Sequence, residues 1–261
     1  MINNSIKLEE ERLKGINNIE EYDMIHERHR GFPQIFENRK HKKIIDLSAG
    51  IGIVANNIKN NYNAEIICNE ISPKCLSILK QNGHKTVSFN LDINKSFPIK
   101  DKTFDNVISL ATIEHIMNID HFVKEIKRIL KDDGYLYIST PNYSSILYLL
   151  PVILTGRTFH DPLNEKSKYE FYAHIRYFTY KTLLEYISSF GFVIDTVYLL
   201  LPKESSKYTA LRFKSWIKAM IFKMAMGIIY RLFSPRWASE PILCFRKGKS
   251  NKKNKTKKRI L

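Results

Sequence analysis

Short apolar runs alternate with stretches of helical periodicity between residues 43 and 140, and no other feature of the sequence constrains the fold more. Strands that alternate with helices are typical of βαβ units, in which helices cover both faces of a parallel sheet. The expected strands are 43–47, 64–70, 86–89, 104–110, 135–140, 192–199 and 242–246. The sequence therefore predicts an α/β fold with a seven-stranded, mostly parallel sheet and helices on both faces.

Two long segments interrupt this alternation. Both insertions, 143–178 and 202–240, are apolar and aromatic, whereas the tail at 247–261 holds eight Lys and Arg residues and no acid. We expect residues 1–246 to form one domain that begins with a helix over 19–38, broken at Pro33. The tail is a basic, low-complexity segment, so we expect it to be disordered.

Charge and composition restrict the setting of the protein. The tail supplies half of the net charge of +16, which suits an anionic membrane surface or nucleic acid. No RNA-binding module is visible, so nucleic acid is the weaker choice. Three cysteines are too few for a disulfide framework, and no uncharged apolar run reaches the roughly 18 residues of a membrane span. These features predict a cytoplasmic protein, with peripheral membrane contact as an alternative.

A glycine-containing loop follows the first expected strand. Gly50 and Gly52 match the spacing of a dinucleotide fingerprint, in which backbone N–H groups approach the ligand. Asp46, at the end of the strand, would repel a pyrophosphate but suits an ammonium group. Glu70 ends the second strand, where an acid can accept hydrogen bonds from two ribose hydroxyls. Together these residues predict a nucleoside ligand with a cationic amino-acid part and no phosphate.

Several motifs in the same order resemble the class I S-adenosylmethionine-dependent methyltransferases, specifically the type 11 methyltransferase-domain family. The first motif is Asp46-Leu47-Ser48-Ala49-Gly50-Ile51-Gly52, with Ser48 in place of the first glycine. The others are Asn69-Glu70-Ile71-Ser72, Asp92-Ile93, Phe97-Pro98-Ile99, Phe104-Asp105, Ile113-Glu114-His115-Ile116 and 128–136. The resemblance covers residues 40–142 and, less fully, 174–199. It implies a Rossmann-like fold and S-adenosylmethionine as the cofactor.

The resemblance also implies roles for individual residues. Glu70 matches the ribose-binding acid, Asp92 matches the acid that reads the adenine amino group, and Ile93 lies beside the ring. The full set of expected cofactor contacts is Asp46, Ser48, Gly50, Gly52, Glu70, Ile71, Asp92, Ile93, Ala111 and Glu114. Taken singly, Asp46, Glu70 and Asp92 could each be an ordinary loop or turn acid.

Two histidines are candidates for a catalytic base. Methyl transfer from a sulfonium is an in-line displacement, in which an oxygen or nitrogen nucleophile can need a base. His115 follows the fourth strand and His174 lies in an aromatic stretch of the first insertion. The alternative is that both are packed histidines and that His174 and Arg176 fasten the segment to the sheet. Ala111 stands where quinone-pathway relatives carry an extra acid, so no metal is expected.

The acceptor cannot be read from the residues directly. In this family the two insertions commonly build the acceptor pocket, and both are long, aromatic and apolar here. We therefore expect O-methylation of a small molecule, a glycan or a lipid-linked intermediate. The alternatives are a non-catalytic cofactor-binding protein that keeps the fold, and an RNA methyltransferase.

Overall fold

The computed structural model describes residues 2–93, 95–163, 168–233, 235–248 and 256–261. In this part of the chain, the strands are β1 (Lys43–Leu47), β2 (Glu65–Asn69), β3 (Lys85–Val87), β4 (Phe104–Leu110), β5 (Leu130–Ser139), β6 (Phe192–Leu199), β7 (Ile242–Lys247) and β8 (Lys257–Ile260). They form a single sheet in the order β3-β2-β1-β4-β5-β7-β6-β8. The strands β1 to β5 are parallel, and β7 runs antiparallel to both β5 and β6. The α/β fold and mostly parallel sheet are thus confirmed.

The expected count of seven strands is wrong, because the described residues form eight. The additional strand, β8, pairs in parallel with β6, with Thr196 opposite Lys257. At the chain end, the Leu261 amide donates to the Leu199 carbonyl at 2.9 Å. The prediction of a disordered tail is therefore wrong for 257–261, because these residues satisfy the open edge of β6. Residues 249–255 lie outside the described part of the chain.

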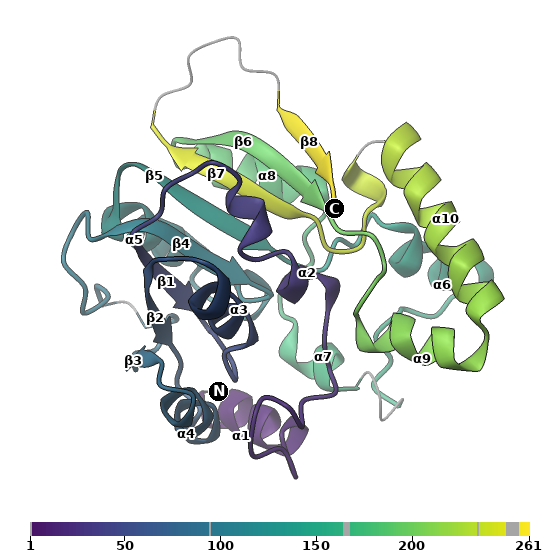
Figure 1. The fold of residues 1–261 in the computed structure, drawn as a ribbon, viewed down its shortest axis with the longest axis horizontal. Helices are drawn as coiled ribbons and strands as arrows, with labels where there is room; N and C mark the ends of the chain where they lie inside the picture. The colour runs from purple at the N-terminus through teal and green to yellow at the C-terminus, as the bar shows by residue number, and fades with distance from the viewer. Residues whose placement is uncertain (1, 94, 164–167, 234, 249–255) are drawn as a thin grey trace.

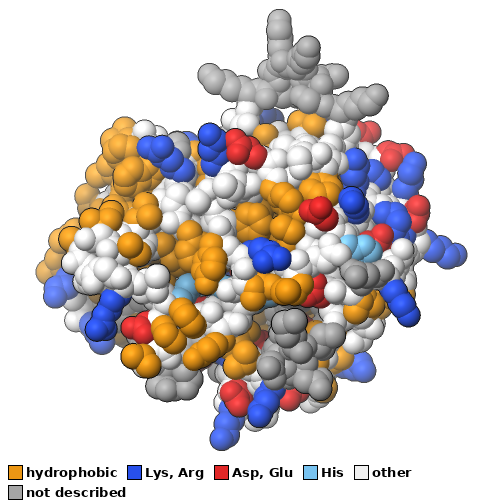
Figure 2. Space-filling model, turned by 180° about the vertical axis from the view of Figure 1, so that it is seen from behind, with side chains coloured by type: hydrophobic (Ala, Val, Ile, Leu, Met, Phe, Trp, Pro, Cys, Tyr) orange, Lys and Arg blue, Asp and Glu red, His pale blue; other side chains and the backbone are white. Residues whose placement is uncertain are grey.

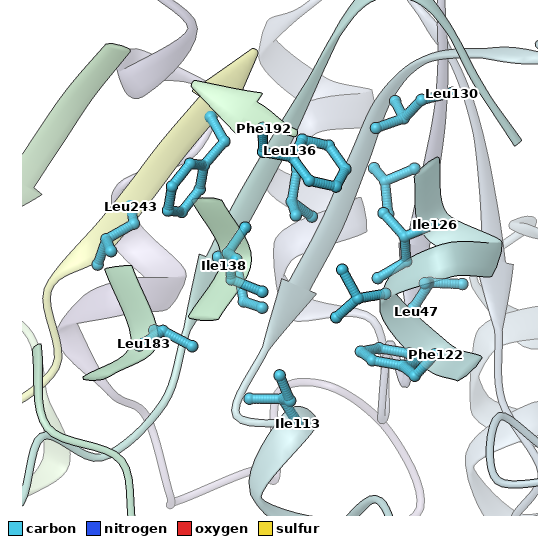
Figure 3. Packing of buried hydrophobic residues seen from close by; sticks show 14 of the residues in the cluster. Leu47, Ile113, Phe122, Ile126, Leu130, Leu136, Ile138, Leu183, Phe192 and Leu243 are labelled. Atoms are coloured by element: carbon cyan, nitrogen blue, oxygen red, sulfur yellow. The ribbon is translucent and has the colours of Figure 1, made fainter. Parts of the chain in front are cut away.

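The sheet has a hydrophobic core on each face. One face packs against α5 (Ile119–Ile129) and α8 (Tyr180–Ser189), and the other packs against α3 (Ile53–Asn61) and the turn η1 (Gln34–Phe36). Successive residues of β1 serve the two cores, since Ile44 belongs to one and Ile45 to the other. Figure 3 shows the α5 side, where Phe122 and Ile126 pack near Leu47.

The predicted N-terminal helix over 19–38 is wrong. The structure instead has α1 (Ile2–Arg12), a short α2 (Glu27–Arg30) and η1. Side-chain bonds to the backbone replace helical bonds at the start of this region: Asn18 Oδ1 accepts from the Glu21 amide, and Glu21 Oε2 accepts from the Asn17 amide. Such local bonds compete with helix formation.

The two insertions form helices that lie outside the sheet. The first contains α6 (Ile146–Thr155) and α7 (Lys168–Ala173), and the second contains α9 (Ser206–Lys214), α10 (Trp216–Leu232) and η3 (Pro235–Trp237). In Figure 1, α6, α9 and α10 lie together at the right of the molecule, whereas α7 lies lower, in contact with α1, which lies beside α4 (Pro73–Gln81). Among the described helices, none combines the length and apolar character that crossing a bilayer requires.

Candidate active site

A cavity of about 1310 Å³ lies at the carboxyl ends of the parallel strands. Open α/β sheets bind ligands at this edge. The expected residues that line it are Asp46, Ser48, Gly50, Glu70, Ile71, Asp92, Ala111, Glu114, His115 and His174. Gly52 and Ile93 are expected residues that do not line it. The cavity therefore brings together eight of the ten predicted cofactor residues and both predicted catalytic histidines.

The loop between β1 and α3 contains two glycines, Gly50 and Gly52, which are needed for different reasons. Gly52 caps α3 with a φ of +90°, and a Cβ there would lie 2.5 Å from the Leu79 side chain. Gly50 has a φ of +56°, and a Cβ there would meet nothing within 4 Å. Ser48 also takes a positive φ of 56°. Gly52 is thus needed for packing against α4, whereas Gly50 keeps the loop open on the cavity side.

The carboxyl of Asp46 is buried at the cavity wall. Burial raises its pKa to about 8, and the nearby carboxyl of Glu70 adds to the shift. Within the described residues, no hydrogen bond reaches this carboxyl. A buried carboxyl without a protein partner gains from a cationic ligand, because the cation favours the ionised form. Asp46 therefore fits the ammonium group of a methionine moiety.

Glu70 is held in place by backbone amides. Its Oε2 accepts from the Gly50 amide at 2.9 Å, and its Oε1 accepts from the amides of Ile71 and Ser72 at 2.7 and 3.2 Å. Burial raises the pKa of Glu70, and these three bonds partly offset that shift. A carboxylate offers about four lone-pair sites, so Oε2 retains capacity for a further donor. Glu70 therefore links the glycine loop to the end of β2 and can still accept from a ribose hydroxyl.

Asp92 has a positioning role in the structure. Its Oδ1 accepts from the amides of Met117 and Asn118, both at 2.9 Å, so it orders the loop that leads into α5. The neighbouring Ile93 is more than one third exposed and lies off the cavity wall. Asp92 remains at the cavity wall as predicted for an adenine contact, and the role of Ile93 stays a prediction.

Glu114, His115 and His174 form a polar cluster at the cavity wall. Glu114 and His115 belong to the turn η2 (Ile113–His115), and His174 follows α7. The rings of the two histidines are 4.8 Å apart between centroids and meet edge to face. The amides of Ile175 and Arg176 donate to the Glu114 carbonyl at 3.0 and 3.1 Å, which ties the first insertion to η2.

The hydrogen bonds of the histidines differ. His115 Nδ1 lies 2.9 Å from the Ala173 carbonyl, which can only accept, so Nδ1 carries the proton and Nε2 has the lone pair. His174 Nδ1 lies 3.1 Å from the Tyr143 hydroxyl. Burial lowers the pKa of His174 to about 3, so this imidazole is neutral at physiological pH. The guanidinium of Arg176 donates to the Met117 carbonyl at 2.9 Å. This bond ties the first insertion to the loop before α5, which is the kind of structural role that the sequence offered as the alternative for Arg176.

The Glu114 carboxyl is fully buried. Within the described residues, neither of its oxygens has a hydrogen-bond partner, and burial raises its pKa. Ligand atoms of Glu114, His115 and His174 lie within 4.8 Å of one another, so these groups could hold a metal ion. The expectation of no metal, which rested on Ala111, stays a prediction.

Two residues of the cavity wall were not identified from the sequence. Arg28 of α2 forms an ion pair with Glu240, which precedes β7, at 2.5 Å. The two side chains are 12% and 19% exposed, so the pair is largely desolvated. They are separated by 212 residues along the chain, and no local pattern marks either one. A buried arginine requires a carboxylate partner, but the sequence does not identify which acid provides it.

Comparisons with known proteins relate this chain to methyltransferases. A methyltransferase-domain family model matches residues 17–197. A ubiquinone biosynthesis O-methyltransferase from Pelagibacter ubique is 26% identical over 117 residues, which is 44% of this chain and 48% of that protein. Norajmaline N-methyltransferase from Rauvolfia serpentina is 31% identical over 105 residues, or 38% and 36% of the two chains. The chain thus spans about half or less of the curated relatives it matches.

Solved structures share the fold. An S-adenosylmethionine-dependent methyltransferase from Mesorhizobium loti has a TM-score of 0.55 at 16% identity, covering 82% of this chain and 95% of that one. The family model covers more than half of the chain, so this chain belongs to the methyltransferase-domain family. Its cofactor is S-adenosylmethionine, and the uncompensated Asp46 carboxyl and the open loop at Gly50 fit that cofactor.

Proposed function

We propose that this protein transfers the methyl group of S-adenosylmethionine to a hydroxyl oxygen of an apolar acceptor in the cavity beside His115 and His174. The observation that carries the proposal is the size and lining of that cavity. Its volume of about 1310 Å³ exceeds the roughly 300–1,000 Å³ of a pocket for one small ligand. Asp46 and Glu70 line one part of it, and the histidines line another. The cavity can therefore hold a cofactor and an acceptor together.

The residues of the chain bind and orient the cofactor and deprotonate the acceptor hydroxyl. Bound S-adenosylmethionine supplies a methyl group on a sulfonium, whose departure leaves a neutral sulfide. Asp46 binds the ammonium group and Glu70 binds the ribose. The lone pair on His115 Nε2 accepts the proton of the acceptor hydroxyl. His174 is a weak base because of its low pKa, so it acts as a neutral hydrogen-bonding group beside His115.

The chemistry of the cavity wall favours an apolar acceptor. The insertions contribute Leu147 and Tyr148 from α6, Leu211 from α9, and Phe222 and Met226 from α10. Such a wall suits an aromatic or lipid-linked acceptor better than a free glycan. The ubiquinone biosynthesis O-methyltransferases among the relatives support oxygen as the methylated atom, and norajmaline N-methyltransferase makes nitrogen the alternative.

The test measures S-adenosylhomocysteine formation with microbial lipid, polar-metabolite, glycan and RNA extracts as acceptors. We expect turnover with the lipid or apolar small-molecule fraction. We also expect a loss of at least about 100-fold in His115→Ala, which is in the range of general-base contributions. His121→Ala on α5 is the matched control and should retain activity. Turnover with RNA alone would contradict the proposed acceptor, and binding of the cofactor without turnover on any fraction would favour the non-catalytic alternative.

A further inference from the structure

Helix α10 exposes apolar side chains to solvent along much of its length. With about 100° per residue, the buried Ala219, Met226 and Tyr230 lie on one side of the helix. An apolar stripe lies on the opposite side: Ile217, Met220, Ile221, Met224, Ile228 and Leu232, of which Met220 is the least exposed at 45% and Leu232 the most at 75%. An isolated exposed apolar residue is ordinary, but a stripe along a whole helix indicates an interaction surface.

The stripe continues onto neighbouring helices. In α6, Ile153 and Leu154 are 74% and 70% exposed, and at the junction of α9 and α10, Phe213 and Trp216 are 83% and 66% exposed. Figure 1 places α6, α9 and α10 at the same end of the molecule, and Figure 2 shows hydrophobic side chains at the surface there from behind. We call these exposed side chains of α6, α9 and α10, together with the α10 stripe, the apolar face.

The two chain segments that carry the apolar face contain charges of one sign only. Residues 144–157 and 206–236 contain no Asp or Glu. Their basic residues are Arg157, Lys207, Arg212, Lys214, Lys218, Lys223, Arg231 and Arg236. On the helical wheel, Lys218 and Lys223 lie at opposite edges of the α10 stripe. A second copy of this chain would bring two cationic faces together, whereas an anionic lipid surface complements the basic residues.

We propose that the apolar face docks on an anionic lipid bilayer, with α10 lying along the interface. The combination of an apolar stripe, an exposed tryptophan and basic residues without acids is that of an interfacial helix. The same helices line the cavity, through Leu147 of α6, Leu211 of α9 and Phe222 of α10. This step rests on the proposed function: because the docked helices also line the cavity, the methyl acceptor would enter from the bilayer. The acceptor is then a membrane-resident amphiphile with a hydroxyl group.

The test is co-sedimentation with vesicles of phosphatidylglycerol and phosphatidylcholine in equal amounts, compared with phosphatidylcholine alone. We expect the full chain to bind the anionic vesicles at least tenfold more tightly than the phosphatidylcholine vesicles. This binding should weaken as the salt concentration increases. Ile221→Glu with Met224→Glu should lower binding at least tenfold. Lys218→Glu should lower it severalfold, and Lys124→Glu on α5, with the same change of charge, should leave it unchanged.

Tryptophan emission tests insertion directly. The chain has two tryptophans, so Trp237→Phe leaves Trp216 as the only reporter. Its emission should shift to the blue with anionic vesicles, and lipids with bromine in the acyl chain should quench it. Absence of sedimentation at low salt, equal loss in Lys124→Glu and Lys218→Glu, or a concentration-dependent dimer abolished by Ile221→Glu would each overturn the proposal. Calorimetry with S-adenosylmethionine on the same variants separates the two proposals. If the folded variants still bind S-adenosylmethionine, a failure of vesicle binding counts against the membrane proposal and not against the proposed methyltransferase function.

Discussion

Replacing Asp46 with Asn removes one negative charge from the cofactor part of the cavity and preserves the shape of the side chain. In the ligand-free protein this carboxyl has a pKa of about 8, so it is mainly protonated at pH 7. The substitution therefore breaks no ion pair in the free protein. The bound methionine moiety, by contrast, loses the partner of its ammonium group. We expect a large effect on cofactor affinity and a small effect on ligand-free stability.

The magnitude follows from the kind of bond that is lost. A hydrogen bond to a charged group contributes about 1.5–3 kcal/mol, and about 1.4 kcal/mol corresponds to a factor of ten. At a pH above about 8, where the wild-type carboxyl is already ionised, Asp46→Asn should therefore weaken S-adenosylmethionine binding by about 10- to 150-fold. Calorimetry gives the affinity, and thermal unfolding without ligand gives the stability. Asp132→Asn, at an exposed carboxylate far from the cavity, is the control and should bind as the wild type does.

The pH dependence provides an independent check. Cofactor binding requires the ionised carboxyl, so below about pH 8 the wild-type protein must release a proton when it binds. Wild-type affinity should therefore rise between pH 6 and pH 8, and the affinity of Asp46→Asn should be nearly flat. A raised acid pKa also means that wild-type stability falls as pH rises through this window, an effect that the variant lacks. Equal affinity of the two proteins at pH 8 would refute the assignment of Asp46.

Four further substitutions test other parts of the site. Glu114→Gln removes a buried carboxyl whose pKa is raised. Thermal unfolding should therefore show a gain in stability that is larger at pH 8 than at pH 5. A loss of stability at both pH values would contradict the raised pKa. Gly52→Ala should destabilise by about 2–4 kcal/mol in urea unfolding, through left-handed strain and overpacking, and Gly50→Ala should cost less stability but more cofactor affinity. Glu240→Gln leaves the Arg28 guanidinium buried without its charged partner and should lower the free energy of unfolding by up to about 3–5 kcal/mol. If the variant unfolds in urea as the wild type does, the ion pair adds little to stability.

The strands of the central sheet were predictable because burial on both faces leaves short runs that are rich in apolar residues. The run at 104–110 coincides with β4, and the one at 43–47 coincides with β1. The N-cap of α4 is equally local, since the Ser72 hydroxyl accepts from the Cys75 amide three residues along the chain. In these cases the signal lies within a few residues, so local sequence is sufficient.

The remaining features depend on pairing over long distances in the chain. Strand β8 contains three basic residues and no alternation, and it forms because the edge of β6 is open. His115 and His174 each appear in a local motif, but their edge-to-face contact depends on how the first insertion folds back to η2. In α10, only the burial of Ala219, Met226 and Tyr230 defines which side of the helix faces outward.

The central claim is that the cavity at the carboxyl ends of β1 and β2 binds S-adenosylmethionine. Its most direct test is isothermal titration of the full chain with S-adenosylmethionine, S-adenosylhomocysteine and a nicotinamide dinucleotide. The account predicts one binding site for each of the first two ligands and no binding of the dinucleotide, because the Asp46 carboxylate would repel a pyrophosphate. Failure of the folded protein to bind either adenosyl ligand, or tight binding of the dinucleotide instead, would contradict it.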